Sequence, residues 1–272
     1  MSVQRHQAFP DIGLLHNVVK RCRLHGAMPP LMYRAKIKLH GTNSAVQLEG
    51  TQVLAQSRSA MLDASNGLYG FREWVERNKD VLRGRIPVSE ARHASASVAG
   101  ASDAPAQRCE GLARANECNE LLDAQNLTLF GEWCGLGIQR GVALSKLDRK
   151  VWAVFAALVS KGEHRQFEVR PEVLATLLPE HPDIFVLPWF SEDAGASMVE
   201  ELLEFDTEME GTVARINQLV QRVEQEDPWV KQTFGLSGTG EGLVWYPRDP
   251  ASIPDGVDYQ ELLFKSKGGK HA

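Results

Sequence analysis

The first third of the chain alternates between apolar and polar residues in short segments, and this pattern predicts β-strands. Residues 34–40, 44–48 and 52–57 are alternating or rich in β-branched side chains, with Gly41 and Gly50 between them. Alternation places side chains on opposite faces of a sheet, and the intervening glycines favour tight turns. We interpret these three segments as an antiparallel meander.

Helical periodicity appears in longer segments. In residues 67–82, Leu68, Phe71, Trp74 and Val75 recur near helical spacing, which predicts an amphipathic helix. Proline at the first position of residues 171–178 also suits a helix start, because that position needs no backbone N–H donor. The acidic, amphipathic pattern predicts two further helices, at residues 198–203 and 213–223.

Strand character returns in the remaining apolar segments, which are residues 127–133, 150–159, 241–246 and 261–267. Short strands with interleaved helices favour an α+β fold over a parallel α/β fold. The sequence also contains no G-x-G-x-x-G fingerprint and no P-loop. We therefore expect two twisted antiparallel sheets flanked by helices, with a cleft between the sheets.

The length of 272 residues allows one large or two small domains, and we expect a single domain over residues 1–272. Residues from about 92 to 108 are rich in Ala and Ser and poor in large apolar side chains, so we expect a mobile loop. The segment from about 160 to 232 is interpreted as an acidic helical insertion.

The charge distribution is uneven. The net charge is −5 and the pI is near 5.9, which excludes a generally basic nucleic-acid coat. Residues 1–40 nevertheless carry seven Lys or Arg against one acid, whereas residues 191–227 carry eleven acids against two arginines. A basic segment alone only weakly indicates phosphate binding, because most charge runs are solvated faces. We expect the acidic segment to lie away from any site for a polyanion.

The sequence shows no apolar leader segment and no run of 18 apolar residues, so we expect a cytoplasmic protein with no membrane association. Four cysteines are scattered without a C-x-x-C pair or a histidine at zinc spacing. We expect four reduced thiols rather than a zinc site or a disulfide framework.

The first candidate for chemistry is the segment Lys38-Leu39-His40-Gly41-Thr42-Asn43. It places an amine at a tight turn where glycine lets the backbone approach a phosphate closely. Considered alone, a lysine at a strand end is more often a solvated charge.

A second candidate is the segment Lys265-Ser266-Lys267, in which the spacing puts two ammonium groups on the same side of a strand. Two such lysines could hold a polyanion and lower the pKa of a neighbouring lysine. A lysine nucleophile needs this neutral form. The alternative is an exposed edge strand that uses lysine to prevent aggregation.

Glu132 and Glu241 each occur in an otherwise apolar strand segment. A buried carboxylate is costly unless it meets a cation, a metal or hydroxyl groups, so each requires a partner. Structural pairing is the commoner explanation for either residue alone.

Taken together, these pieces resemble the RNA ligase 2 family of the covalent nucleotidyltransferases. KLHGTN resembles the K-x-[D/H/N]-G-[T/S]-N nucleophile motif of that family. SRS, FGEW, KVWAVF, EGLVW and FKSK resemble the later motifs, in the expected order between residues 36 and 267. The resemblance implies a nucleotidyltransferase (ATP-grasp-like) fold. Only five residues follow Lys267, so we expect the adenylyltransferase domain without a C-terminal accessory domain.

The resemblance also implies a role for each matching residue. Lys38 would attack the α-phosphate of ATP and become lysyl-AMP. Nucleotide-binding roles would fall to Ile37, Arg58, Glu132, Trp152, Lys265 and Lys267, and Glu241 would bind Mg²⁺ or Mn²⁺. Trp152 is our choice over Phe155 for stacking on adenine. His40 and Asn43 would lie near the 5′-phosphate of the RNA.

The implied activity is that of an ATP-dependent RNA ligase acting on RNA ends or a nicked duplex. In this reaction AMP passes from lysine to an RNA 5′-phosphate, and a 3′-hydroxyl then seals the break. A DNA ligase or a GTP-using capping guanylyltransferase is the main alternative, because the core chemistry is shared. A catalytically idle RNA-end-binding module is the second alternative.

Overall fold

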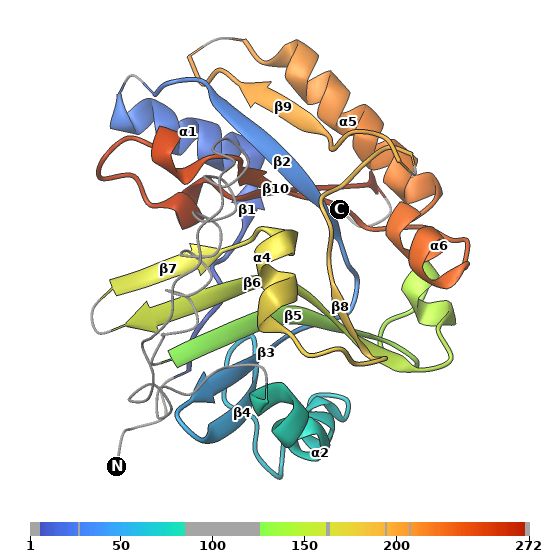
Figure 1. Cartoon of the computed structure of the whole chain (residues 1–272). Helices are drawn as coiled ribbons and strands as arrows, with labels where there is room; N and C mark the ends of the chain where they lie inside the picture. The colour runs from blue at the N-terminus through green and yellow to red at the C-terminus, as the bar shows by residue number, and fades with distance from the viewer. Residues whose placement is uncertain are drawn as a thin grey trace, which may run out of the picture. The chain divides into compact units, whose positions relative to one another are not determined.

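Two β-sheets with associated helices make up the described parts of the protein, for which we use a computed structural model (Figure 1). It describes residues 6–26, 28–84, 126–161, 164–193, 195–206 and 208–269. The Ala/Ser-rich segment predicted to be a mobile loop lies outside these ranges. Within them, no helix combines the length and apolar character needed to cross a membrane.

The first sheet has five strands, which lie in the order β1 (Gly13–Leu14), β11 (Phe264–Lys267), β10 (Gly242–Pro247), β2 (Leu31–Lys38) and β9 (Glu200–Leu203). All neighbours in this sheet are antiparallel except β1 and β11, which are parallel. Strands from both ends of the chain therefore meet at the centre of this sheet.

The second sheet has six strands, with the order β4 (Gln52–Ser57), β3 (Thr42–Glu49), β5 (Asn126–Gly135), β6 (Lys150–Lys161) and β7 (His164–Glu168), while β8 (Ile184–Val186) pairs with β6. The predicted pairing of residues 44–48 with residues 52–57 is confirmed. The meander is wrong in its first strand, because β2 belongs to the other sheet. The mixed α+β class with two sheets is confirmed.

The helical elements are α1 (Leu15–His25), α2 (Phe71–Arg83), α4 (Pro171–Leu177), α5 (Glu210–Gln225) and α6 (Pro228–Phe234), with 3₁₀ turns η2 (Ala143–Lys146), η3 (Pro250–Ser252) and η4 (Tyr259–Leu262). The predictions for α2, α4 and α5 are confirmed. The helix predicted at residues 198–203 is wrong, since the edge strand β9 occupies this segment and pairs with β2.

The chain divides into two units. The first contains Met1–Gln7, Asn43–Gly131 and Ala153–Val186, and the second contains Ala8–Thr42, Glu132–Trp152 and Leu187–Ala272. The five-stranded sheet lies wholly in the second unit. Strands β5 and β6 of the other sheet begin in one unit and end in the other.

Successive side chains of β2 point to opposite faces of the sheet, and the two faces have different surroundings. Tyr33 lies on the face that forms a core, where its ring is 5.4 Å from that of Phe264. Trp245 stacks on Phe264 at 5.8 Å on the same face, and all three side chains are fully buried or nearly so. Lys36 and Lys38 consequently project from the opposite face.

Candidate active site

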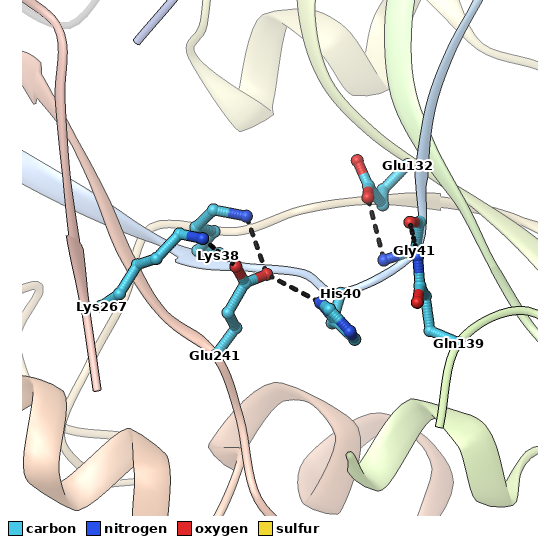
Figure 2. Close-up of polar contacts among 7 residues, drawn as sticks. All are labelled: Lys38, His40, Gly41, Glu132, Gln139, Glu241 and Lys267. Atoms are coloured by element: carbon cyan, nitrogen blue, oxygen red, sulfur yellow. Dashed lines mark hydrogen bonds and ion pairs between the residues drawn. The ribbon is translucent and has the colours of Figure 1, made fainter. Parts of the chain in front are cut away.

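The carboxylate of Glu241 lies at the centre of a cluster of basic side chains (Figure 2). Its Oε2 accepts a hydrogen bond from Lys38 Nζ at 2.7 Å and lies 3.3 Å from His40 Nδ1. Its Oε1 is 2.9 Å from Lys267 Nζ. The Glu241 side chain is only 4% exposed, whereas the two lysines retain 23% and 29% exposure. The acid is therefore buried beneath partners that solvent still reaches.

The strand register explains why these residues meet. Gly242 lies opposite Lys38 of β2 and opposite Lys267 of β11, so the two lysines flank one glycine of β10. Gly242 has a φ of +151°, and a Cβ there would lie 2.1 Å from the carbonyl oxygen of Ser266. Only glycine fits this position. The preceding residue, Glu241, lies between the two amines.

The electrostatics of Glu241 reflect two opposing effects. Burial alone would raise its pKa, but the positive charge of Lys38 and hydrogen bonds from Lys38 and Lys267 outweigh burial and hold the pKa below its ordinary value. Glu241 is therefore ionised near neutral pH. In this arrangement the amine of Lys38 is engaged in an ion pair with that carboxylate.

The turn that follows Lys38 is held by two further side chains (Figure 2). The backbone N–H of Gly41 donates to Glu132 Oε1 at 2.9 Å, and the carbonyl of Gly41 accepts from Gln139 Nε2 at 3.2 Å. Glu132 lies within β5, and Gln139 lies in the loop after this strand. The glycine is tightly enclosed, because a Cβ at Gly41 would lie 2.6 Å from the carbonyl oxygen of Trp133.

Gln139 is a site residue that the sequence interpretation missed. It has a positive φ of +57°, within a glycine-rich stretch directly after the FGEW motif. The glycines signal a tight loop, but nothing in the local sequence indicates a hydrogen bond to a backbone carbonyl 98 residues away.

The remaining predicted residues lie in different places. Val244 of β10 pairs with Lys265 of β11 on one side and with Lys36 of β2 on the other. Lys265 therefore lies on the same face of the sheet as Lys38, two residues along its strand from Lys267. Ile37 is buried and lines a pocket of about 710 Å³. Its predicted nucleotide contact stays a prediction.

Other predictions also stay open. Trp152 is fully buried in β6, and Phe155 retains 9% exposure, so the choice of Trp152 as the adenine stacker stays a prediction. Arg58, which is exposed, and Asn43 belong to the first unit. Their proposed phosphate contacts are likewise untested.

The residues present suit a divalent cation only in a limited way. Among the described residues there is no group of three or more His, Cys, Asp or Glu side chains arranged to hold a metal ion. Mg²⁺ is commonly bound by one or two carboxylates together with substrate phosphates. Glu241 fits this pattern, provided that a nucleotide supplies the remaining oxygen ligands.

The two-sheet α+β fold and the lysine-carboxylate-lysine cluster on one sheet are the features that the sequence resemblance predicted for a covalent nucleotidyltransferase. The sequence profile of the RNA ligase family matches residues 33–266. The chain therefore belongs to the RNA ligase family. No curated protein sequence matches it.

Solved structures support the fold. A glutamate-to-alanine mutant of a Naegleria gruberi RNA ligase with ATP and Mn is 16% identical, with a TM-score of 0.50 over 97% of this chain and 57% of that chain. A second such mutant with AMP and Mn is 15% identical, with the same TM-score and coverage. The chain thus spans a little over half the length of these relatives.

Proposed function

We propose that this chain is the adenylyltransferase domain of an ATP-dependent RNA ligase and that Lys38 is its nucleophile. The observation that carries the proposal is that Lys38, Glu241 and Lys267 lie together although their segments are separate in sequence. They meet because β2 and β11 pair with β10 on either side of Gly242. Membership of the RNA ligase family and the nucleotides named for the Naegleria gruberi structures add support.

In the first step, the neutral amine of Lys38 attacks the α-phosphorus of ATP. A P–N bond forms, the bond to the β-phosphate oxygen breaks, and pyrophosphate leaves. Lys267 stands beside Lys38 across Gly242, where its positive charge stabilises the charge that develops on the α-phosphate. A divalent metal ion, when bound, would neutralise the triphosphate and orient it for displacement, and Glu241 would be its protein ligand.

Two further phosphoryl transfers complete the proposed reaction. An oxygen of the RNA 5′-phosphate takes the AMP from lysine, which restores the free amine. A 3′-hydroxyl then attacks the activated 5′-phosphate, forms the phosphodiester and releases AMP. The substrates would be RNA ends or a nicked duplex, with His40 and Asn43 near the 5′-phosphate.

The experiment that tests this proposal is incubation of the purified protein with α-labelled ATP and Mg²⁺ or Mn²⁺. We expect an acid-labile label on the wild type, no label on Lys38→Ala, and normal labelling of Lys79→Ala, whose lysine pairs with Glu76 on the exposed face of α2. A wild-type protein that takes up no label contradicts the proposal.

Two additions separate the related reactions. Labelling from GTP instead of ATP would indicate a capping-type guanylyltransferase. Supplying pre-adenylylated RNA together with an RNA 3′-hydroxyl tests sealing without the first step. The same assay with DNA strands distinguishes a DNA ligase.

A further inference from the structure

The loop formed by residues 136–149 is basic in a chain that is acidic overall. It carries Arg140, Lys146 and Arg149 against the single acid Asp148, whereas the whole chain has a net charge of −5. All four of these side chains are exposed, and the Lys146 amine donates a hydrogen bond to the carbonyl oxygen of Ser237 at the surface. The loop is therefore an electropositive surface feature.

This basic loop is fixed to both halves of the candidate active site. On one side of Arg140, Gln139 donates to the carbonyl of Gly41 in the nucleophile turn at 3.2 Å. On the other side, the carbonyl of Gly141 accepts from Thr239 Oγ1 at 2.8 Å, two residues before Glu241. Arg140 is thus anchored between the segment that carries Lys38 and the segment that carries Glu241.

The backbone conformation directs Arg140 outward. Its two neighbours, Gln139 and Gly141, have φ values of +57° and +80°, so the chain turns sharply on both sides of it. Gln139 anchors the turn through its side chain and Gly141 through its backbone carbonyl, whereas the Arg140 side chain is exposed. A non-glycine residue with positive φ costs energy, which the hydrogen bond from Gln139 to Gly41 helps to offset.

The other two cations of the loop, Lys146 and Arg149, are also exposed. Arg149 lies 3.8 Å from its neighbour Asp148 in an exposed pair, and such pairs contribute little stability and exchange readily for stronger partners. Lys146 holds a neutral carbonyl rather than a carboxylate. The loop therefore presents three exposed cations to solvent.

We infer that the basic loop binds the phosphates of the RNA strand whose 5′-phosphate takes AMP from Lys38, with Arg140 as the principal contact. This inference rests on the proposed function. A guanidinium matches two phosphate oxygens in a forked geometry, and the anchors of the loop place this group beside the nucleophile turn. A polynucleotide is the polyanion that an RNA ligase must hold at this place.

The test uses the full chain and compares Arg140→Gln with Lys20→Gln. Lys20 is exposed on α1, which packs against the opposite, Tyr33-bearing face of the five-stranded sheet. Each variant removes one positive charge. Binding to a fluorescent, pre-adenylylated RNA is measured by anisotropy over a range of salt concentrations, and self-adenylylation is measured on the same preparations.

We expect Arg140→Gln to weaken RNA binding about tenfold and to reduce the slope of log affinity against log salt by roughly 0.7 to 0.9, the value for one phosphate contact. Lys20→Gln should match the wild type, and Arg140→Lys should restore the slope. The Arg140→Gln substitution must also lower the affinity for RNA by a larger factor than it lowers the rate of self-adenylylation.

Several results would overturn the inference: equal RNA binding by Arg140→Gln and Lys20→Gln, an equal fall in RNA binding and self-adenylylation, or equal competition by polyglutamate. Absence of RNA binding by a wild-type protein that still labels Lys38 would overturn it while leaving the proposed function intact. Absence of that label contradicts the proposed function itself, so the two failures are distinguishable.

Discussion

Lys38 and Glu241 are 203 residues apart in sequence, yet the Nζ of the lysine lies 2.7 Å from Oε2 of the glutamate. The residue proposed as the nucleophile is thus ion-paired with the residue proposed as the metal ligand. Anything that engages the carboxylate competes with the ion pair and releases the Lys38 side chain from it. Metal binding and activation of the nucleophile should therefore be coupled through this contact.

Replacing Glu241 with glutamine should weaken the response to metal. The neutral amide keeps a hydrogen-bond acceptor but lacks the charge that attracts a divalent cation. We expect self-adenylylation to fall and the Mg²⁺ concentration for half-maximal labelling to rise by about tenfold or more. Glu76→Gln, which removes an acid paired with Lys79 on the exposed face of α2, serves as the control. An unchanged Mg²⁺ requirement in Glu241→Gln would contradict the coupling.

Gly41→Ala should damage both stability and activity. The added methyl group would lie 2.6 Å from the carbonyl oxygen of Trp133 and 2.8 Å from Cys134 Cβ, so the nucleophile turn must shift. We expect a loss of about 1–3 kcal/mol in unfolding free energy and a loss of labelling at Lys38. Gly211→Ala in α5 is a matched control with open space around it, and should stabilise slightly. Equal denaturation midpoints for the two variants would refute the steric argument.

The local elements were largely predictable, whereas their partners were not. Alternation identified residues 44–48 and 52–57 as paired strands because their hydrogen-bond partners are close in sequence. The same reasoning joined residues 34–40 to them, although β2 pairs instead with β10, more than 200 residues later. The tight turn at Gly41 was visible in the sequence, but the change of sheet that it makes was not.

The error at residues 198–203 has a related cause. Six residues are too few for periodicity to distinguish a helix from a strand, so the acidic, amphipathic composition was read as helical. Pairing of Leu203 with Leu31 and of Glu200 with Arg34 decided the outcome. Glu200, one of the acids that had made the segment resemble a helix, instead forms an ion pair across the strands with Arg34 at 2.7 Å.

The candidate site was predictable where a motif concentrates unusual residue types. Lys38, Glu241 and Lys267 each stood out as a charge in or beside an apolar segment, and the structure brings them together. Gln139 did not stand out, because a glutamine in a loop is ordinary and its effect lies in one hydrogen bond to Gly41. Backbone contacts of this kind leave little trace in a single sequence.

Lys36→Met should separate charge from stability. Lys36 is fully buried, with its amine 5.0 Å from the Trp189 ring centroid and 5.8 Å from that of Tyr246. Loss of these cation–π contacts is offset by removal of a buried charge, so we expect unfolding free energy to change by no more than about 1 kcal/mol. Lys36→Ala should cost about 2–4 kcal/mol, because it leaves a cavity.

The same Lys36→Met variant should bind ATP more weakly, because Lys36 lies on the face of β2 that carries Lys38 and contributes to its positive potential. We expect a several-fold rise in the ATP concentration for half-maximal labelling, with thermal stability retained. Chemical denaturation and labelling kinetics on one preparation check both parts. Unchanged ATP dependence would show that the buried charge serves packing alone.

Asp227→Asn should change how stability depends on pH. The Asp227 carboxyl is 2% exposed and caps α6 by accepting from the Val230 N–H at 3.0 Å. Burial raises its pKa from 3.8 to about 6, although hydrogen bonds from the backbone of Val230 and Trp229 act in the opposite direction. The folded protein therefore binds a proton more readily than the unfolded chain between these two values.

The sign of the effect follows from this difference. Stability from the protonated Asp227 is complete below about pH 4 and is lost as the pH rises through about 6, which amounts to about 3 kcal/mol for a shift of this size. Asparagine can accept the same capping bond without a charge. We expect Asp227→Asn to match the wild type near pH 4 and to exceed it by about 1–3 kcal/mol at pH 8, as measured by urea unfolding. Asp227→Ala also loses the helix cap, so its unfolding free energy at pH 8 should rise by less than that of Asp227→Asn. If the wild type is more stable than Asp227→Asn at pH 8, the buried charge of Asp227 is not costly.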